Sequence, residues 1–131
     1  MEDFRTFIAR REEAARAFCR GDVSRVVDLS ARTDPATFFG PDGKVVEGAE
    51  AVRKDYQSAS GAFGPGGDCG FEVMQMTSDG DLGFWTGLQM AEVELGGNRM
   101  PMTLRVTEVF RRENGNWTLI HRHADAQKPA T

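Results

Sequence analysis

The sequence predicts an α+β fold in which a curled, mainly antiparallel sheet forms a half-barrel and three helices of the N-terminal half enclose a pocket against it. The 131 residues, of which 40% are apolar, suffice for one core, so residues 1–131 are expected to form a single domain. Helical periodicity is confined to the first half of the chain. The second half consists of long runs rich in Val, Thr, Phe, Trp and Met, separated by short glycine-containing turns, which is typical of antiparallel strands.

Three helices are predicted before residue 61. Residues 3–20 place apolar side chains at the spacing of one buried helical stripe, and Gly21 is suited to end this helix because glycine adopts the left-handed conformation readily. Asp22 can cap a shorter helix that buries valines up to Val27. A third helical pattern starts after Gly48 and continues to a glycine-rich loop. The arginines of the first helix alternate with glutamates and are expected on a solvated face.

The strands are predicted as a short hairpin and a longer meander. The hairpin flanks Pro41-Asp42-Gly43, and the meander comprises residues 70–77, 83–95, 99–113 and 117–125. Strands of about 13 and 15 residues exceed the usual length and must twist and curl, with Gly87 and Pro101 as plausible bends. A curled sheet under helices often leaves a pocket between the two layers.

Strand alternation places Glu108 among apolar side chains. In the 99–113 strand, Glu108 has the same parity as Met102, Leu104, Val106 and Phe110, which form the more apolar face. A carboxylate among such neighbours must be paired, protonated or functional, because burying it alone costs free energy.

The last strand contributes two histidines by the same rule. His121 and His123 have the parity of Trp117, so both are expected to point into the hollow that holds Glu108 on the adjacent strand. A carboxylate and an imidazole in an apolar cavity could exchange a proton near neutral pH. In the alternative interpretation, Glu108 forms a structural ion pair with Arg105, Arg122 or a histidine.

The candidate catalytic residues are therefore Glu108, His121 and His123. The residues expected to contact a ligand are Phe18, Phe39, Tyr56, Phe71, Met102, Arg105, Phe110, Trp117 and Asp125. The spacing of His121, His123 and Asp125 also suits a metal, but the chain offers too few further ligands, so no metal and no cofactor is expected.

Charge and composition restrict the classes of partner and the compartment expected for this protein. The formal net charge of −4 argues against a nucleic-acid partner, and no apolar run approaches the length of a membrane span, so no membrane association is expected. The N-terminus lacks the apolar region of a signal peptide. Cys19 and Cys69 match no metal or redox motif and are interpreted as reduced thiols of a cytoplasmic protein.

Four segments resemble one protein family. They are Arg20-Gly21-Asp22, DPATFFG at 34–40, EGAEAV at 47–52 and, most specifically, RVTEVFRRENGNWTLIHRHAD at 105–125. Together they are similar to SnoaL-like, ketosteroid isomerase-like proteins of the nuclear transport factor 2-like superfamily. The 105–125 segment is also similar to the association domain of calcium/calmodulin-dependent protein kinases, in which a charged residue at the position of Glu108 lines the pocket.

This resemblance implies a cone-shaped sheet, three helices, a deep pocket and a homodimer formed through the sheet. It does not imply one reaction, because the superfamily includes isomerases, cyclases, dehydratases and modules without catalysis. The catalytic groups of the steroid isomerases would fall near Ala14, Gly40 and Thr107, which carry none of the required chemistry. Steroid isomerisation by that mechanism is therefore not expected.

Two functions follow as hypotheses. In the first, the protein is an isomerase, cyclase or dehydratase that binds a small hydrophobic carbonyl compound, with Glu108 or His121 as the base and an imidazole or Arg105 as electrostatic support.

In the second hypothesis, the chain is a non-catalytic ligand-binding or dimerisation domain. Its inward polar groups satisfy one another or hold a bound acid. The outer face of the sheet, with Trp85, Gln89, Arg105, Thr107 and Val109, would then make a two-fold interface.

Overall fold

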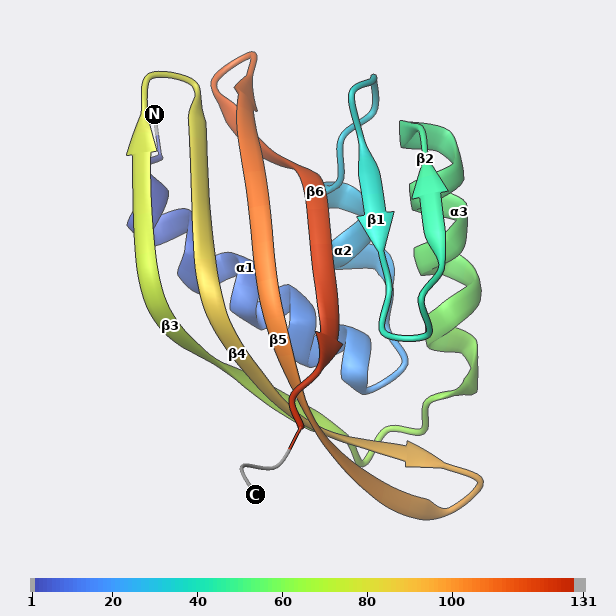
Figure 1. Ribbon diagram of the computed structural model, residues 1–131. Helices are drawn as coiled ribbons and strands as arrows, with labels where there is room; N and C mark the ends of the chain where they lie inside the picture. Colours follow the sequence, from blue (N-terminus) through green and yellow to red (C-terminus); the bar gives the residue numbers. More distant parts are fainter. Residues whose placement is uncertain (1, 129–131) are drawn as a thin grey trace.

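The computed structural model describes residues 2–128 as one sheet with helices on one side (Figure 1). The helices are α1 (Phe4–Cys19), α2 (Ser24–Leu29), α3 (Ala49–Ala59) and the short 3₁₀ helix η1 (Ser60–Ala62). The strands are β1 (Thr37–Phe39), β2 (Val45–Glu47), β3 (Asp68–Asp79), β4 (Leu82–Leu95), β5 (Asn98–Glu113) and β6 (Asn116–Ala126). The predicted α+β fold with a curled sheet is confirmed. None of the helices in residues 2–128 is both long and apolar enough to span a membrane.

The six strands follow the order β2-β1-β6-β5-β4-β3. The predicted meander forms β3 to β6, and the predicted hairpin forms β1 and β2. All neighbours are antiparallel except β1 and β6, which run parallel. Figure 1 shows α1 crossing the concave side of the long strands and α3 lying beside the β1–β2 hairpin.

The start and end of α1 follow its sequence. The Asp3 side chain accepts a hydrogen bond from the Thr6 N–H at 2.8 Å and caps the first turn. After the last turn, Gly21 has a φ of 93°, which glycine adopts without strain. The buried stripe between these ends contains Phe4, Phe7, Ile8, Arg11, Ala14, Ala15 and Cys19. Arg11 is therefore buried, and its predicted place on a solvated face is wrong.

Aromatic side chains fill the half-barrel around the start of α1. The Phe4 ring lies 4.9 Å from the Trp117 ring and 5.6 Å from the Phe110 ring, both in edge-to-face geometry. Phe7 contacts Phe110 in the same way at 5.1 Å. These rings fill that end of the half-barrel, and the cavity between helices and sheet lies toward the C-terminal end of α1.

The curl of the sheet coincides with Gly87. The register of β3 shifts against β4 between Val73 and Gln75, next to the position where Val73 pairs with Gly87. A Cβ at residue 87 would collide with the Glu72 carbonyl, so this close approach requires glycine. Pro101 pairs with β4 without a shift of register.

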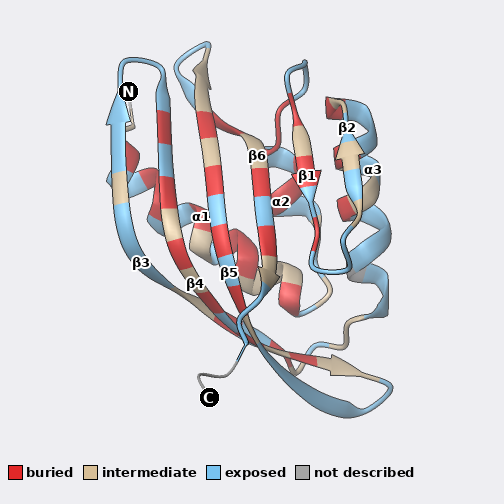
Figure 2. Cartoon of the chain, in the orientation of Figure 1, coloured by how far each residue is buried: buried red, intermediate tan, exposed pale blue. Residues whose placement is uncertain are grey.

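A second irregularity lies in β6. Val109 pairs with His121, whereas the next residue, Phe110, pairs with Leu119, so Ile120 is an extra residue in the ladder. Side chains alternate across a strand, and one inserted residue therefore reverses the face of every residue beyond it. Figure 2 shows how buried and exposed residues otherwise alternate along β4 and β5.

The irregularity exchanges the two faces of the C-terminal half of β6. Trp117 is buried before it, and Arg122 and Ala124 are buried after it. His121 and His123 consequently point to the outer face of the sheet. The prediction that both histidines share the inner face with Trp117 is wrong, because it assumed unbroken alternation.

Candidate functional site

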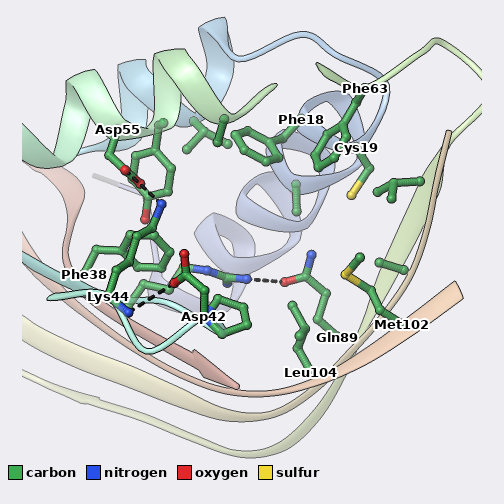
Figure 3. Close-up of a pocket in the computed structure, with 18 of the residues that line it drawn as sticks. Phe18, Cys19, Phe38, Asp42, Lys44, Asp55, Phe63, Gln89, Met102 and Leu104 are labelled. Atoms are coloured by element: carbon green, nitrogen blue, oxygen red, sulfur yellow. Dashed lines mark hydrogen bonds and ion pairs between the residues drawn. The ribbon is translucent and has the colours of Figure 1, made fainter. Parts of the chain in front are cut away.

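A cavity of about 340 Å³ opens between the helices and the inner face of the sheet (Figure 3). The C-terminal half of α1, helix α3, the β1–β2 hairpin and the inner faces of β4, β5 and β6 supply its walls. The apolar lining includes Phe18, Val26, Phe38, Phe63, Val93 and Leu104. This volume lies near the lower end of the range for small-molecule sites, so the cavity has room for one small compound.

A buried charged cluster lies behind the apolar walls, on the inner side of the sheet. Glu108 Oε1 accepts hydrogen bonds from Arg11 Nε at 3.1 Å and Trp85 Nε1 at 2.9 Å. Glu108 Oε2 accepts from Arg11 Nη2 and from Arg122 Nη1, both at 2.7 Å. Gln89 Oε1 in turn accepts from Arg122 Nη2 at 2.8 Å. These five residues are called the Glu108 cluster below.

The secondary structure explains why these side chains meet. Trp85 of β4 pairs with Glu108 of β5, which pairs with Arg122 of β6, so the three form one row across the sheet. Arg11 reaches this row from the helix side, because it follows Phe7 by one helical turn on the buried face of α1. Arg11 and Arg122 line the cavity, whereas Glu108 lies behind them.

The cluster carries a net positive charge. Burial alone would raise the pKa of Glu108, but the charges and hydrogen bonds of Arg11 and Arg122 outweigh burial and lower it to about 2. Burial opposes the charge of Arg11 as well, yet Glu108 keeps the pKa of that guanidinium above its usual value. Two guanidiniums thus face one carboxylate, and one positive charge is left without a partner inside the cluster.

Three buried polar atoms of cavity-lining residues make no hydrogen bond within the described residues. They are Arg11 Nη1, Tyr56 Oη and Asp55 Oδ2. Burial raises the pKa of Tyr56 to about 12, so its hydroxyl stays protonated and can donate. Arg11 Nη1 and Tyr56 Oη are thus donors without a partner, and Asp55 Oδ2 is an acceptor without one.

Polar side chains of the β1–β2 hairpin and α3 also border the cavity. Lys44 Nζ donates to Asp55 Oδ1 at 2.9 Å and lies 5.7 Å from the centre of the Phe38 ring. The backbone N–H of Lys44 donates to Asp42 Oδ1 at 3.1 Å. Figure 3 shows Asp42, Lys44 and Asp55 on the opposite side of the cavity from Met102.

The structure places the twelve predicted site residues in four locations. Phe18, Tyr56 and Met102 line the cavity. Glu108 points inward as predicted, but it contacts arginines rather than histidines. Three further predicted ligand contacts are not cavity residues, because they pack in the core: Phe71 stacks on Trp85 at 4.5 Å, and Phe110 and Trp117 belong to the aromatic cluster of Phe4.

The other five predicted residues lie on the outer face, away from the cavity. They are Phe39, His121, His123, Arg105 and Asp125. His121 Nδ1 is hydrogen-bonded to Thr37 Oγ1 at 2.7 Å. Burial and, to a smaller extent, the charge of His123 lower the pKa of His121. Phe39 packs edge-to-face on both imidazoles.

Arg105 and Asp125 form a two-bond ion pair at 2.6 and 2.8 Å. Arg105 and Asp125, predicted at the pocket, therefore do not line the cavity, because both side chains point to the outer face of the sheet.

Sequence reasoning missed Arg11 and placed Gln89 on the outer face. It named Arg122 only as one of three possible ion-pair partners of Glu108, and the structure contains this pair. Arg11 follows Phe7 by four residues and Ile8 by three, so helical spacing already placed it on the buried stripe. Gln89 shares its parity with the buried Trp85. Unbroken alternation assigned Arg122 to the outer face, since the extra residue in β6 is not visible in the pattern of the sequence.

A curled six-stranded sheet covered by three α-helices around a cavity defines the cone-shaped α+β fold of the nuclear transport factor 2-like superfamily. Within it, the chain belongs to the SnoaL-like domain family, whose sequence pattern matches residues 9–125. The recognition of this family from the sequence is confirmed. No curated protein matches the chain.

Three solved structures illustrate the likeness. A protein of Thiobacillus denitrificans, provisionally designated a calcium/calmodulin-dependent protein kinase type II association domain, is 19% identical, with a TM-score of 0.74 and 98% of each chain covered. A provisionally designated dehydratase of Streptomyces avermitilis is 20% identical, with a TM-score of 0.74 and 93% and 91% covered. A ketosteroid isomerase-like protein of Erwinia carotovora atroseptica is 18% identical, with a TM-score of 0.73 and 94% of each chain covered. At this identity the likeness establishes the fold alone.

Proposed function

We propose that the cavity binds a small organic anion, in particular a carboxylic acid with an apolar body. The observation that carries the proposal is the Arg11 guanidinium, which is buried at the cavity and has one nitrogen, Nη1, without a hydrogen-bond partner among the described residues. A buried N–H without a partner is costly, and a carboxylate would accept from it and offset the excess positive charge of the Glu108 cluster.

The charge of the Glu108 cluster supports an anion rather than a neutral ligand. Arg11 and Arg122 together carry one positive charge more than Glu108 neutralises. Electrostatic attraction is stronger in a site shielded from water than at the surface. An anion at the cavity is therefore favoured over a neutral compound of the same shape.

The remaining walls define the rest of the ligand. The Tyr56 hydroxyl offers a second donor close to the same arginines, whose charges act on its pKa. Beyond these donors the lining includes rings and aliphatic side chains such as Phe18, Phe63 and Leu104, with Asp42, Lys44 and Asp55 on the side of the β1–β2 hairpin. The proposed ligand is thus amphipathic, with its acid group at Arg11 and Tyr56 and its apolar part along these walls.

Proton transfer by the residues predicted from the sequence is less well supported. Both Glu108 oxygens already accept hydrogen bonds from charged donors, and a pKa of about 2 makes this carboxylate a weak base near neutral pH. His121 and His123 lie on the opposite face of the sheet. We therefore favour binding over isomerase, cyclase or dehydratase chemistry that uses these groups.

Calorimetric titration with hexanoate and benzoate, each compared with its neutral amide, tests the proposal. The acids are expected to bind at least about tenfold more tightly than the amides, because a hydrogen bond to a charged group contributes roughly 1.5–3 kcal/mol. Tyr56→Phe is expected to weaken acid binding about tenfold without loss of stability, since the removed hydroxyl has no partner.

Arg105→Gln is the matched control. It removes an arginine of the outer face and is expected to leave the affinity unchanged. Equal binding of acid and amide, or binding of neither, would refute the proposed function.

We also propose that two copies of the chain associate through the outer face of the sheet. Leu82, Phe84 and Met90 occupy the outward positions of β4 and are 53%, 37% and 43% exposed. Apolar side chains gathered on one face are typical of an interface, and a two-fold contact would cover the same patch on both copies. Trp85 and Gln89, expected on this face from the sequence, instead point inward.

A further inference from the structure

The two cysteines of the chain lie in one small cluster at the cavity wall. Cys19 is the last residue of α1, and Cys69, fifty residues later in the sequence, lies near the start of β3. Both are free thiols, and they pack together with Ala15, Ala91 and Val93. Cys19 lines the cavity, whereas Cys69 lies behind it. A small molecule in the cavity can therefore reach Cys19 first.

The backbone around the pair is held in place by two arginines of α1. Arg16 Nε donates to the Cys69 carbonyl at 3.0 Å, and Arg20 Nε donates to the Gly67 carbonyl at 3.2 Å. The chain also approaches closely at Gly67, where a Cβ would collide with the Cys19 carbonyl. These contacts keep the end of α1 against the start of β3, so the two thiols remain neighbours without a covalent bond.

The two thiols have unequal surroundings. The interaction with the Cys69 thiol, together with the charges of Arg122 and Arg11, lowers the pKa of Cys19 despite its burial. The same interaction, followed by burial, raises the pKa of Cys69. Gln89 Nε2 also donates to Cys69 Sγ at 3.6 Å. Cys19 is consequently the more nucleophilic thiol and Cys69 its proton-bearing neighbour.

We propose that Cys19 and Cys69 form an oxidisable pair, in which Cys19 reacts with a small hydroperoxide that enters the cavity and Cys69 resolves the product as an intramolecular disulfide. This inference does not depend on the proposed anion ligand, because it rests on the shared cluster of the two cysteines, the close approach at Gly67 and the place of Cys19 at the cavity wall.

The reaction proceeds in two balanced steps. The Cys19 thiolate attacks the terminal oxygen of the hydroperoxide, an S–O bond forms as the O–O bond breaks, and the leaving alkoxide takes up a proton and departs as an alcohol. The Cys69 sulfur then attacks the sulfenic sulfur of Cys19, the S–S bond forms, and the hydroxyl group leaves with the Cys69 proton as water. The two thiols lose two electrons, which reduce the peroxide.

Oxidation of the reduced protein with cumene hydroperoxide tests this proposal. Intact-mass measurement is expected to show the loss of two hydrogens, and peptide mapping without reductant is expected to show a Cys19–Cys69 crosslink within one chain. In Cys69→Ser, Cys19 is expected to stop at the sulfenic acid, which dimedone traps. In Cys19→Ser, Cys69 is expected to react at least about tenfold more slowly than Cys19 does in Cys69→Ser.

Alkylation of the unmodified chain provides a measurement that does not depend on the folding of the variants. Iodoacetamide at limiting concentration is expected to label Cys19 in preference to Cys69. Equal labelling, equal reactivity of the two single variants, or oxidation that yields only crosslinks between chains would overturn the proposal.

Discussion

Glu108 and Arg122 face each other across β5 and β6, and Arg122 Nη1 donates to Glu108 Oε2 at 2.7 Å. The pair exists because Ile120 is an extra residue in β6, which turns Arg122 rather than the histidines toward the inner face. Arg11, 97 residues before Glu108, completes the carboxylate's bonds from the opposite side. A single register shift thus decides which cation the buried carboxylate meets.

Glu108→Gln is expected to destabilise the fold by about 3–5 kcal/mol, because it leaves two buried guanidiniums without their counter-charge. Urea unfolding monitored by circular dichroism measures this loss. The control is Glu92→Gln, which breaks an exposed ion pair with Arg99 and is expected to cost less than about 1 kcal/mol. Similar losses in both variants would contradict the structural role of the Glu108 cluster.

Acid should weaken the fold through the same carboxylate. The pKa of Glu108 lies at about 2 in the folded protein, below its ordinary value of 4.5, so the stabilisation is complete above pH 4.5 and is lost as the pH falls toward 2. The gap in unfolding free energy between the unchanged protein and Glu108→Gln is therefore expected to narrow below pH 4.5. A gap that stays constant through this range would mean that Glu108 is not ionised in the folded state.

Gly87→Ala is expected to destabilise the protein by about 1–3 kcal/mol, since the added Cβ collides with the Glu72 carbonyl and forces β3 away from β4. Gly61→Ala is the matched control, because a Cβ there meets no atom within 4 Å. Thermal unfolding of the two variants compares them directly. If both melt like the unchanged protein, the close approach at Gly87 does not support the curl of the sheet.

His121→Ala is expected to leave acid binding unchanged, since the imidazole contacts Thr37 and Phe39 on the outer face. The titration with hexanoate measures this. Loss of hexanoate binding in His121→Ala would instead place the histidine at the ligand.

Burial and, to a smaller extent, the charge of His123 lower the pKa of His121. The free energy of unfolding should therefore fall in mild acid, where that imidazole is forced to take up a proton.

Phe84→Lys tests the proposed contact between two copies. Sedimentation velocity at micromolar concentration is expected to show a dimer for the unchanged chain and a monomer for the variant, because the substitution places like charges on both sides of the two-fold interface. Glu50→Lys, at an exposed position of α3 outside the sheet, serves as a control for the change of charge. A monomeric unchanged chain would refute the interface.

Much of the fold was predictable because it depends on local patterns. The apolar stripe of residues 3–20, the glycine at 21 and the turns between the long strands each specify their element without reference to the rest of the chain. The inward direction of Glu108 followed from alternation along β5, where no residue is inserted beside it on its own strand. The position of Arg11 was also accessible from helical spacing, although it was assigned to the solvated face.

The sequence by itself determined the class of fold, the order of its elements and the burial of one carboxylate, since these follow from periodicity and turn chemistry within short segments. Only the tertiary structure decided the partners of that carboxylate. An extra residue at Ile120 leaves no trace in composition, yet it exchanges His121 for Arg122 at the inner face. The contact with Arg11 depends on how α1 crosses the sheet, which is set by packing between segments far apart in the chain.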